Sequence, residues 1–180
     1  MGELVFVHPD ASYLLEISAY RLEMLVEGSS MDGCGALKRF EDAREWLAAV
    51  RLMSDPATVP AGKVPCTQFI YADSDTGEIY GMLQIRNELN EYCKRYVGHI
   101  GYSVRPSRRG HGYAKEMLRH ALRYCKNQLH MDRVQVSCLL ENEASRKTIL
   151  ACGGKFEERV YEPLEGVWLD KHYINLQDVK

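Results

Sequence analysis

Hydrophobic and polar positions along the 180-residue chain follow two periods, one typical of helices and one typical of strands. Segments with an apolar residue at every third or fourth position predict amphipathic helices, and short alternating or continuous apolar runs predict strands. Glycines and prolines between these segments mark the turns. The predicted helices are residues 10–25, 40–53, 113–129 and 143–151, and the predicted strands are residues 3–7, 68–72, 78–86, 98–104, 133–140, 155–161 and 167–176.

The element order β-α-α-β-β-β-α-β-α-β-β indicates the fold class. The helix at residues 113–129 joins two strands near the middle of the chain, which predicts one parallel crossover within a mixed sheet. We therefore expect an α/β (mixed α+β) fold, in which a central mixed sheet of six to seven strands is flanked by about four helices. No repeat, low-complexity tract or shift in composition divides residues 1–180, which predicts a single domain.

Charge and composition argue against several function classes. The 23 Lys+Arg and 25 Asp+Glu residues give a formal net charge of −2, which does not favour nucleic acid or an anionic membrane as a partner. Apolar runs are far shorter than a membrane span, and the first residues lack the basic and apolar regions of a secretory signal. The six cysteines, none in CxxC spacing, predict a reduced, cytoplasmic protein without a metal site.

A basic, glycine-rich segment lies between the strand at 98–104 and the helix at 113–129. Gly110 and Gly112 permit positive φ and close backbone approach, so that successive N–H groups can face one anion. The following helix directs the positive end of its dipole to the same point. Arg108 and Arg109 add fixed positive charge. These features predict a pyrophosphate site.

Other interpretations of this segment fit less well. The sequence has no Walker A pattern, and the dinucleotide fingerprint requires a small residue where Lys115 stands. A basic turn that merely connects a strand to a helix is a further alternative. The combination of strand, basic glycine turn and helix favours the phosphate site.

The same segment carries a family resemblance. Arg109-Gly110-His111-Gly112-Tyr113-Ala114 matches the pattern Arg/Gln-x-x-Gly-x-Gly/Ala of the GNAT family of N-acetyltransferases. Glu141-Asn142-Glu143-Ala144-Ser145 resembles that family's Asn-x-Ala-Ser segment, and the stretch from His99 to Pro106 resembles a group of predicted bacterial acetyltransferases. The resemblance covers about residues 98–156 and implies a GNAT fold with acetyl-CoA as co-substrate.

The resemblance also implies which residues hold acetyl-CoA. In the family, the strand before the glycine loop pairs with the pantetheine arm through its backbone, and the loop holds the pyrophosphate. The asparagine after the next strand meets the pantetheine. Carried over to this sequence, the cofactor-binding residues are Tyr102, Ser103, Val104, Arg108, Arg109, Gly110, His111, Gly112, Tyr113, Ala114, Asn142 and Ser145.

Direct attack of a primary amine on the thioester is the reaction that the resemblance implies. A base must take a proton from the amine, because an ammonium group is not a nucleophile. His99 is the candidate for this catalytic role because the ordinary histidine pKa suits it, although a structural strand histidine is an equally good interpretation. Glu88 and Glu141 rank below His99.

One position departs from the family pattern. Many members have a tyrosine seven residues after the asparagine, where it acts as the acid for the leaving thiolate, and this sequence has Ile149 there. Either the thiolate leaves without help, or Tyr102, Tyr161 or Tyr173 replaces the missing acid. The sequence does not rank these three tyrosines.

The acceptor stays open at this point. We expect an N-acetyltransferase that acts on a small-molecule amine or a protein amine. A non-catalytic acyl-CoA-binding module with the GNAT fold is the alternative, and an unrelated nucleotide-phosphate binder is a third hypothesis. By analogy with the family, the loops at residues 27–38 and 55–66 are candidates to cover the acceptor. A homodimer, common among family members, is a candidate assembly.

Overall fold

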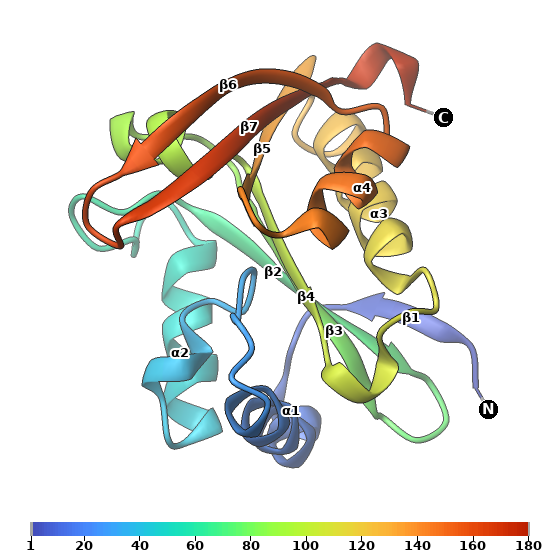
Figure 1. Ribbon diagram of the computed structural model, residues 1–180. Coiled ribbons are helices and arrows are strands. Elements are labelled where there is room, and N and C mark those ends of the chain that lie inside the picture. The colour runs from blue at the N-terminus through green and yellow to red at the C-terminus, as the bar shows by residue number, and fades with distance from the viewer. Residues whose placement is uncertain (1, 180) are drawn as a thin grey trace.

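The computed structural model describes residues 2–179, and within that range the predicted order of helices and strands is confirmed. The observed boundaries differ from the predicted ones by only a few residues. The strands are β1 (Leu4–Val7), β2 (Cys66–Asp73), β3 (Ile79–Arg86), β4 (Ile100–Val104), β5 (Arg133–Leu139), β6 (Lys155–Glu162) and β7 (Val167–Asn175), and the α-helices are α1 (Leu14–Val26), α2 (Ala43–Ser54), α3 (Tyr113–Asn127) and α4 (Glu143–Ala151) (Figure 1).

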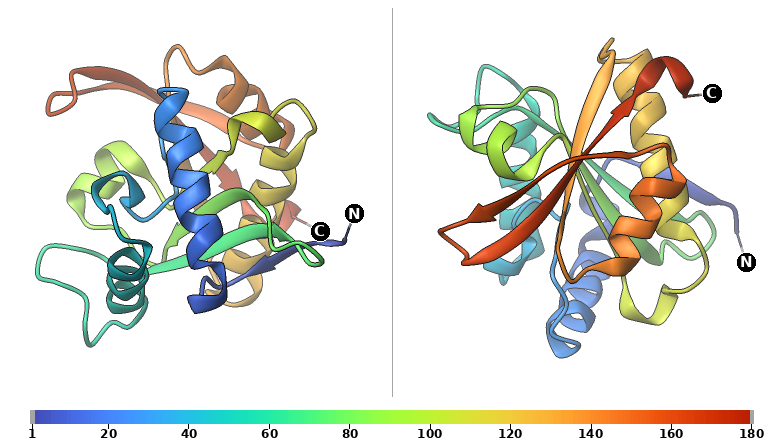
Figure 2. Two further views of the ribbon diagram at one scale, coloured as in Figure 1. Left: turned by 90° about the horizontal axis from the view of Figure 1, so that it is seen from below. Right: turned by 45° about the horizontal axis from the view of Figure 1, so that its top comes forward.

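The strands form two antiparallel sheets, which corrects the prediction of one mixed sheet with six to seven strands. One sheet has the order β1-β2-β3-β4, and the other has the order β5-β7-β6. Within residues 2–179, a single isolated bridge links the two sheets, between Gly98, two residues before β4, and Val136 of β5. Apolar periodicity marks a strand but not its partner, so it did not show that the two strands joined by α3 would separate. The hairpin of β6 and β7 extends as a long arm away from α3 and α4 (Figures 1 and 2).

Helices cover both faces of the four-stranded sheet (Figure 1). α1 and α2 pack on one face through Ile17, Tyr20 and Trp46, which are fully buried. α3 packs on the other face, in a cluster that also contains residues of β5, α4 and β7. Every residue of β2 is buried, because this strand lies between the two helical layers. Each large apolar side chain buried in this way stabilises the fold by about 1.5–3 kcal/mol.

The helices differ in how they begin. Asp42 accepts a hydrogen bond from the N–H of Arg44 and caps α2, and Asn142 accepts one from the N–H of Ser145 and caps α4. Such caps satisfy N–H groups that would otherwise lack a partner in the first turn. α3 begins at Gly112, which has no side chain and provides no such cap. The free first turn of α3 therefore requires another partner.

Several short helical turns were not predicted from the sequence. One of them is the π-helical turn Cys93–Val97 between β3 and β4. It is too short to give an apolar period. Within residues 2–179, no helix combines the length and the apolar composition that a membrane crossing requires.

Candidate functional site

A cavity of about 1020 Å³ opens beside the diverging strands β4 and β5. Its walls are residues of both strands, the first turns of α3 and α4, the loop after α1, the turn Cys93–Val97 and the end of the β6–β7 hairpin. Small-molecule sites range from about 300 to 1,000 Å³. The cavity therefore lies at the upper end of this range.

One edge of β4 faces away from β3 with free backbone groups. Arg86 donates its N–H to the carbonyl of His99, and Arg105 donates its N–H to β3, so odd-numbered residues make the bonds to β3. Such bonds alternate along an antiparallel pair. The N–H groups of Tyr102 and Val104 consequently point to the opposite edge, where a ligand can pair with them as a further strand would.

The segment Arg108–Ala114, here called the glycine loop, has a backbone geometry that suits an anion. Gly110 and Gly112 have φ values of 83° and 85°, in the left-handed region that favours glycine. Among the residues that the structure describes, the N–H groups of residues 110–114 donate no hydrogen bond. Successive free donors at the positive end of a helix are the kind of group that binds an anion such as a phosphate.

The two arginines of the glycine loop also hold it in place. Arg109 donates from Nε to the carbonyl of Val104 at 3.1 Å and from Nη2 to Ser29 Oγ at 2.9 Å. Arg108 donates to both carboxylate oxygens of Glu78, at 2.9 and 2.5 Å. This pairing raises the pKa of Arg108, so the guanidinium stays charged. Both arginines line the cavity.

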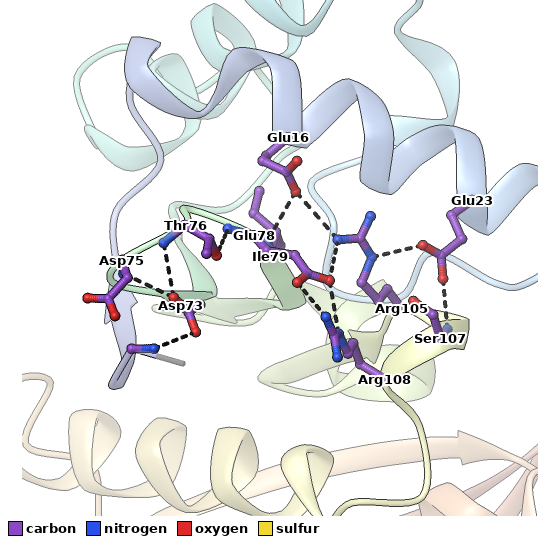
Figure 3. A network of polar contacts seen from close by, with 11 residues as sticks. Glu16, Glu23, Asp73, Asp75, Thr76, Glu78, Ile79, Arg105, Ser107 and Arg108 are labelled. Atoms are coloured by element: carbon purple, nitrogen blue, oxygen red, sulfur yellow. Dashed lines mark hydrogen bonds and ion pairs between the residues drawn. The ribbon is translucent and has the colours of Figure 1, made fainter.

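An ion network around the buried Arg105 lies beneath the glycine loop (Figure 3). Arg105 is only 6% exposed, and its Nε donates to Glu23 at 2.9 Å. Its Nη1 lies 3.4 Å from Glu16 and 3.3 Å from Glu78. Glu23 also accepts the N–H of Ser107 at 2.7 Å. The network therefore anchors the start of the loop to α1 and to the β2–β3 hairpin.

Three predicted cofactor residues meet across the cavity. Asn142 Oδ1 accepts the N–H of Ser145 at 3.0 Å, which places both residues at the N-terminus of α4. Ser145 Oγ forms a hydrogen bond of 3.0 Å with Tyr102 Oη. The bond joins α4 to β4, and all three residues line the cavity.

The other predicted residues of β4 and α3 have different surroundings. Tyr113 and Ala114 line the cavity from the first turn of α3. Ser103 also lines it, but its hydroxyl is bonded within the core, to Tyr20 at 3.0 Å and to Cys34 at 3.1 Å. Its side chain therefore fastens α1 and the loop after it to β4.

Neither predicted histidine lines the cavity. His99 Nδ1 accepts the N–H of Gln135 at 3.0 Å, and the backbone N–H of His99 donates to the carbonyl of Gln135 at 2.7 Å. Burial lowers the pKa of His99 to about 4. This geometry favours a structural role at the junction of β4 and β5, and the role of His99 as a base stays a prediction. His111 is exposed, and its Nδ1 lies 2.7 Å from the carbonyl oxygen of Arg109.

A second group of lining residues, here called the acidic wall, combines carboxylates with aromatic rings. Its members are Asp32, Tyr92, Tyr96, Glu162 and Glu165. Glu162 is 3% exposed, and its carboxylate accepts the N–H groups of Leu164 at 3.0 Å and Glu165 at 2.6 Å. Burial and the neighbouring Glu162 carboxylate raise the pKa of Tyr92.

No sequence pattern marked the acidic wall as a site. The two carboxylates considered as candidate bases, Glu88 and Glu141, do not line the cavity. Of the two candidate loops, 27–38 contributes Ser29, Ser30 and Asp32, whereas none of residues 55–66 belongs to the lining. Near Glu162 the sequence predicted only the turn at residues 163–166, which indicates a hairpin but not which side chains lie beside it.

The tyrosine candidates are now separated by position. Ile149, at the position where the family pattern has a tyrosine, is fully buried in the core. Tyr161 and Tyr173 lie on β6 and β7 and do not line the cavity. Tyr102 does line it.

Comparisons with known proteins agree with this architecture. The crystal structure of ribosomal-protein-S5-alanine acetyltransferase from Vibrio fischeri matches with a TM-score of 0.74 at 17% identity, over 100% of this chain and 97% of that one. Dodecameric spermidine N-acetyltransferase from Vibrio cholerae matches with a TM-score of 0.68 at 17% identity, over 97% and 94% of the two chains. No curated protein matches. At this identity the two structures show that the fold is shared.

The family follows from the sequence itself. The model of the acetyltransferase (GNAT) domain matches residues 30–155. The protein belongs to the GNAT family, and the expected fold is confirmed apart from the number of strands in each sheet.

Proposed function

We propose that the protein is an acetyl-CoA-dependent N-acetyltransferase whose acceptor is a primary amine on a positively charged molecule. The observation that carries the proposal is the cavity, in which the glycine loop offers free N–H donors and arginines while the acidic wall offers carboxylates. Membership of the GNAT family supports acyl transfer to an amine. We infer the identity of both substrates from the glycine loop and the acidic wall.

The lining residues fit acetyl-CoA. The free N–H groups of residues 110–114 suit its pyrophosphate, and the N–H groups of Tyr102 and Val104 suit its pantetheine arm. Ser137, on β5, lines the cavity, and its buried Oγ has no hydrogen-bond partner among the described residues. A buried hydroxyl without a partner costs free energy that a bound ligand can recover.

The chemistry needs little beyond positioning and electrostatics. Bound acetyl-CoA supplies the activated acetyl group. A cavity-facing N–H of β4 stabilises the negative charge that develops on the acetyl oxygen during attack. Holding the amine and the thioester together removes much of the entropic barrier of a bimolecular reaction.

The acidic wall supports a cationic acceptor. Asp32, Glu162 and Glu165 attract ammonium groups, and the rings of Tyr92 and Tyr96 offer faces on which a cation is also stabilised. Because acetyl-CoA is anionic and the acceptor is cationic, acetyl-CoA prefers the glycine loop and the acceptor prefers the acidic wall. An acceptor with several amines, such as spermidine, fits this charge separation better than an uncharged amine.

Calorimetric binding of acetyl-CoA tests the cofactor site. Gly112→Ala is expected to weaken binding at least 10-fold, because a side chain at φ 85° strains the loop and obstructs its N–H groups. Gly153→Ala is the matched control: Gly153 has φ 87°, also has open space around it, and does not line the cavity. Equal binding by both variants, or tighter binding of ATP than of acetyl-CoA, contradicts the proposal.

Release of free CoA tests the transfer. Spermidine is expected to react faster than a neutral peptide with an N-terminal alanine. Binding of acetyl-CoA without transfer to spermidine, the peptide or any of a broad panel of amines identifies a non-catalytic acyl-CoA-binding module instead.

We also propose that the protein works in a reducing compartment such as the cytoplasm. All six cysteines are unpaired, and five of them are buried. Burial raises the pKa of Cys34 to about 12 and that of Cys66 to about 11, which keeps these thiols unreactive. Protein isolated without reductant is expected to have the same intact mass as reduced protein.

A further inference from the structure

Two hydroxyl groups meet across the cavity in a position that the reaction described so far does not use. Tyr102 Oη, from β4, lies 3.0 Å from Ser145 Oγ, from the first turn of α4. Both residues line the cavity. The strand that offers free backbone groups to a ligand therefore also presents a phenol there.

The pair has one O–H hydrogen to spare. Each hydroxyl carries one hydrogen, and the bond between them uses only one of the two, whichever oxygen donates. Neither oxygen has another hydrogen-bond partner among the described residues. When Ser145 donates to Tyr102, the phenol hydrogen is free to bond a third group.

α4 offers no tyrosine for this task. Ser145 and Ile149 are four residues apart and lie on the same face of the helix. Ile149 is fully buried and apolar, so its position supplies no proton donor. The phenol on this side of the cavity instead comes from β4 and is held by the serine one helical turn before Ile149.

The protonation state of Tyr102 suits a hydrogen-bond donor. Burial raises its pKa well above the usual range. The phenol thus stays neutral wherever an enzyme of this kind operates, and a neutral phenol donates a hydrogen bond to an anion.

On the basis of the proposed acetyl transfer, we infer that Tyr102 is the catalytic residue that stabilises the departing CoA thiolate and that Ser145 positions it. The amine nitrogen bonds to the acetyl carbon, the carbon–sulfur bond breaks, and the electron pair stays on sulfur. Tyr102 donates its hydrogen bond to that sulfur while Ser145 donates to Tyr102. The amine proton passes to water, and the thiolate takes a proton from water on release.

Thiol ionisation in bound CoA tests this inference without any acceptor. The probe is the ultraviolet absorbance of thiolate in protein saturated with CoA, compared with protein saturated with desulfo-CoA, as a function of pH. The wild type is expected to lower the thiol pKa by about one unit relative to Tyr102→Phe, because a hydrogen bond to the charged form favours that form. Tyr161→Phe, which removes an exposed hydroxyl outside the cavity, is expected to match the wild type.

Kinetics with spermidine provide the second readout. Tyr102→Phe is expected to lower kcat about 100-fold, typical of the loss of a proton-donating group, with KM for acetyl-CoA changed less than threefold. Ser145→Ala is expected to have an intermediate effect, and Ser145→Thr, which keeps a hydroxyl, is expected to restore most of kcat.

The outcomes separate this inference from the proposed function. A wild type that does not bind CoA overturns both. CoA binding with the same thiol pKa in the wild type and Tyr102→Phe overturns the thiolate role alone. A rise in KM at constant kcat also contradicts it, since that result assigns Tyr102 only to cofactor binding.

Discussion

The glycine loop and the acidic wall line the same cavity, but they are built in opposite ways. The glycine loop is one continuous segment, and its binding groups are mostly backbone N–H donors at the start of α3. The acidic wall combines side chains from three distant places: the loop after α1, the turn Cys93–Val97 with the residue before it, and the end of the β6–β7 hairpin.

This difference separates a site fixed by local conformation from one fixed by packing. A backbone concavity depends on glycines, a helix start and nearby charge, all of which are adjacent in the sequence. A wall of side chains depends on how segments 60 or more residues apart approach one another. Substitutions that disturb long-range contacts should therefore affect the two parts of the cavity unequally.

Gly33→Ala is expected to have the largest effect on stability, because Gly33 packs against β4 and so holds the loop that carries Asp32 of the acidic wall. Gly33 has φ 72°, and a Cβ there would lie 2.1 Å from the carbonyl oxygen of Gly101 on β4. Left-handed strain and overpacking together should destabilise the protein by about 3 kcal/mol. Urea denaturation measures this loss.

Gly28→Ala is the matched control for that substitution. Gly28 has φ 61° in the same loop region, but nothing lies within 4 Å of the added Cβ. It is expected to lose only about 1 kcal/mol. Equal losses in the two variants would show that the contact with β4 does not hold the loop.

Arg105→Met is expected to have the next largest effect on stability. It tests whether the glycine loop depends on the ion network that anchors it to α1 and to the β2–β3 hairpin. The substitution removes the buried partner of Glu16, Glu23 and Glu78. Breaking a buried pair costs about 3–5 kcal/mol, but the three carboxylates are partly exposed, so solvent should reduce the loss to about 2 kcal/mol. Arg44→Met, at an exposed ion pair, is the control and should change the denaturation midpoint little.

Low pH should weaken the ion pairs beneath the glycine loop and those in the second sheet. Burial alone would raise the pKa of Glu23, but the hydrogen bonds from Ser107 and the charge of Arg105 lower it overall. Hydrogen bonds from Arg159 lower the pKa of Asp170 on β7. A lowered carboxyl pKa contributes stability that is complete above the unfolded-state pKa of about 4 and is lost as the pH falls through the folded-state pKa.

Thermal unfolding as a function of pH measures that contribution. The wild type should lose stability as the pH falls below about 4. Glu23→Gln and Asp170→Asn should each flatten this dependence, one beneath the glycine loop and one in the second sheet. An unchanged slope in both variants contradicts the assignment of acid sensitivity to these groups.

Glu165→Gln should have the smallest effect and should act on one substrate only. Glu165 lines the acidic wall and is exposed, so the loss of its charge is worth roughly 0.2–1 kcal/mol. That corresponds to a few-fold rise in KM for spermidine, without change in acetyl-CoA affinity. Glu91→Gln, exposed and outside the lining, should change neither constant.

The order of helices and strands could be predicted from the sequence, because each helix or strand has its own apolar periodicity. The stripe of α3 and the turn after β2 are local features, and both match the structure. The apolar pattern did not show the division into two sheets. Within residues 2–179 the sheets are linked by a single bridge, between Gly98 before β4 and Val136 of β5, and no apolar pattern records how many backbone hydrogen bonds two strands share.

Among the predicted site residues, those defined by backbone geometry were the easiest to place. Gly110 and Gly112 have the positive φ that their loop demands. His99 shows the opposite case: its type suits a base, but its ring accepts a hydrogen bond from Gln135 and lies outside the cavity lining. A residue's chemistry is in the sequence, whereas the direction of its side chain is not.

By itself, the sequence determined the helices and strands, the glycine loop between β4 and α3, and the family to which the chain belongs. Each of these depends on residues close together in the chain. Only the tertiary structure decided that the sheet divides, that Glu162 joins Tyr92 on one wall, and that Tyr102 meets Ser145. Those facts depend on packing between segments far apart in the chain, and side-chain contacts of that kind have no local signature.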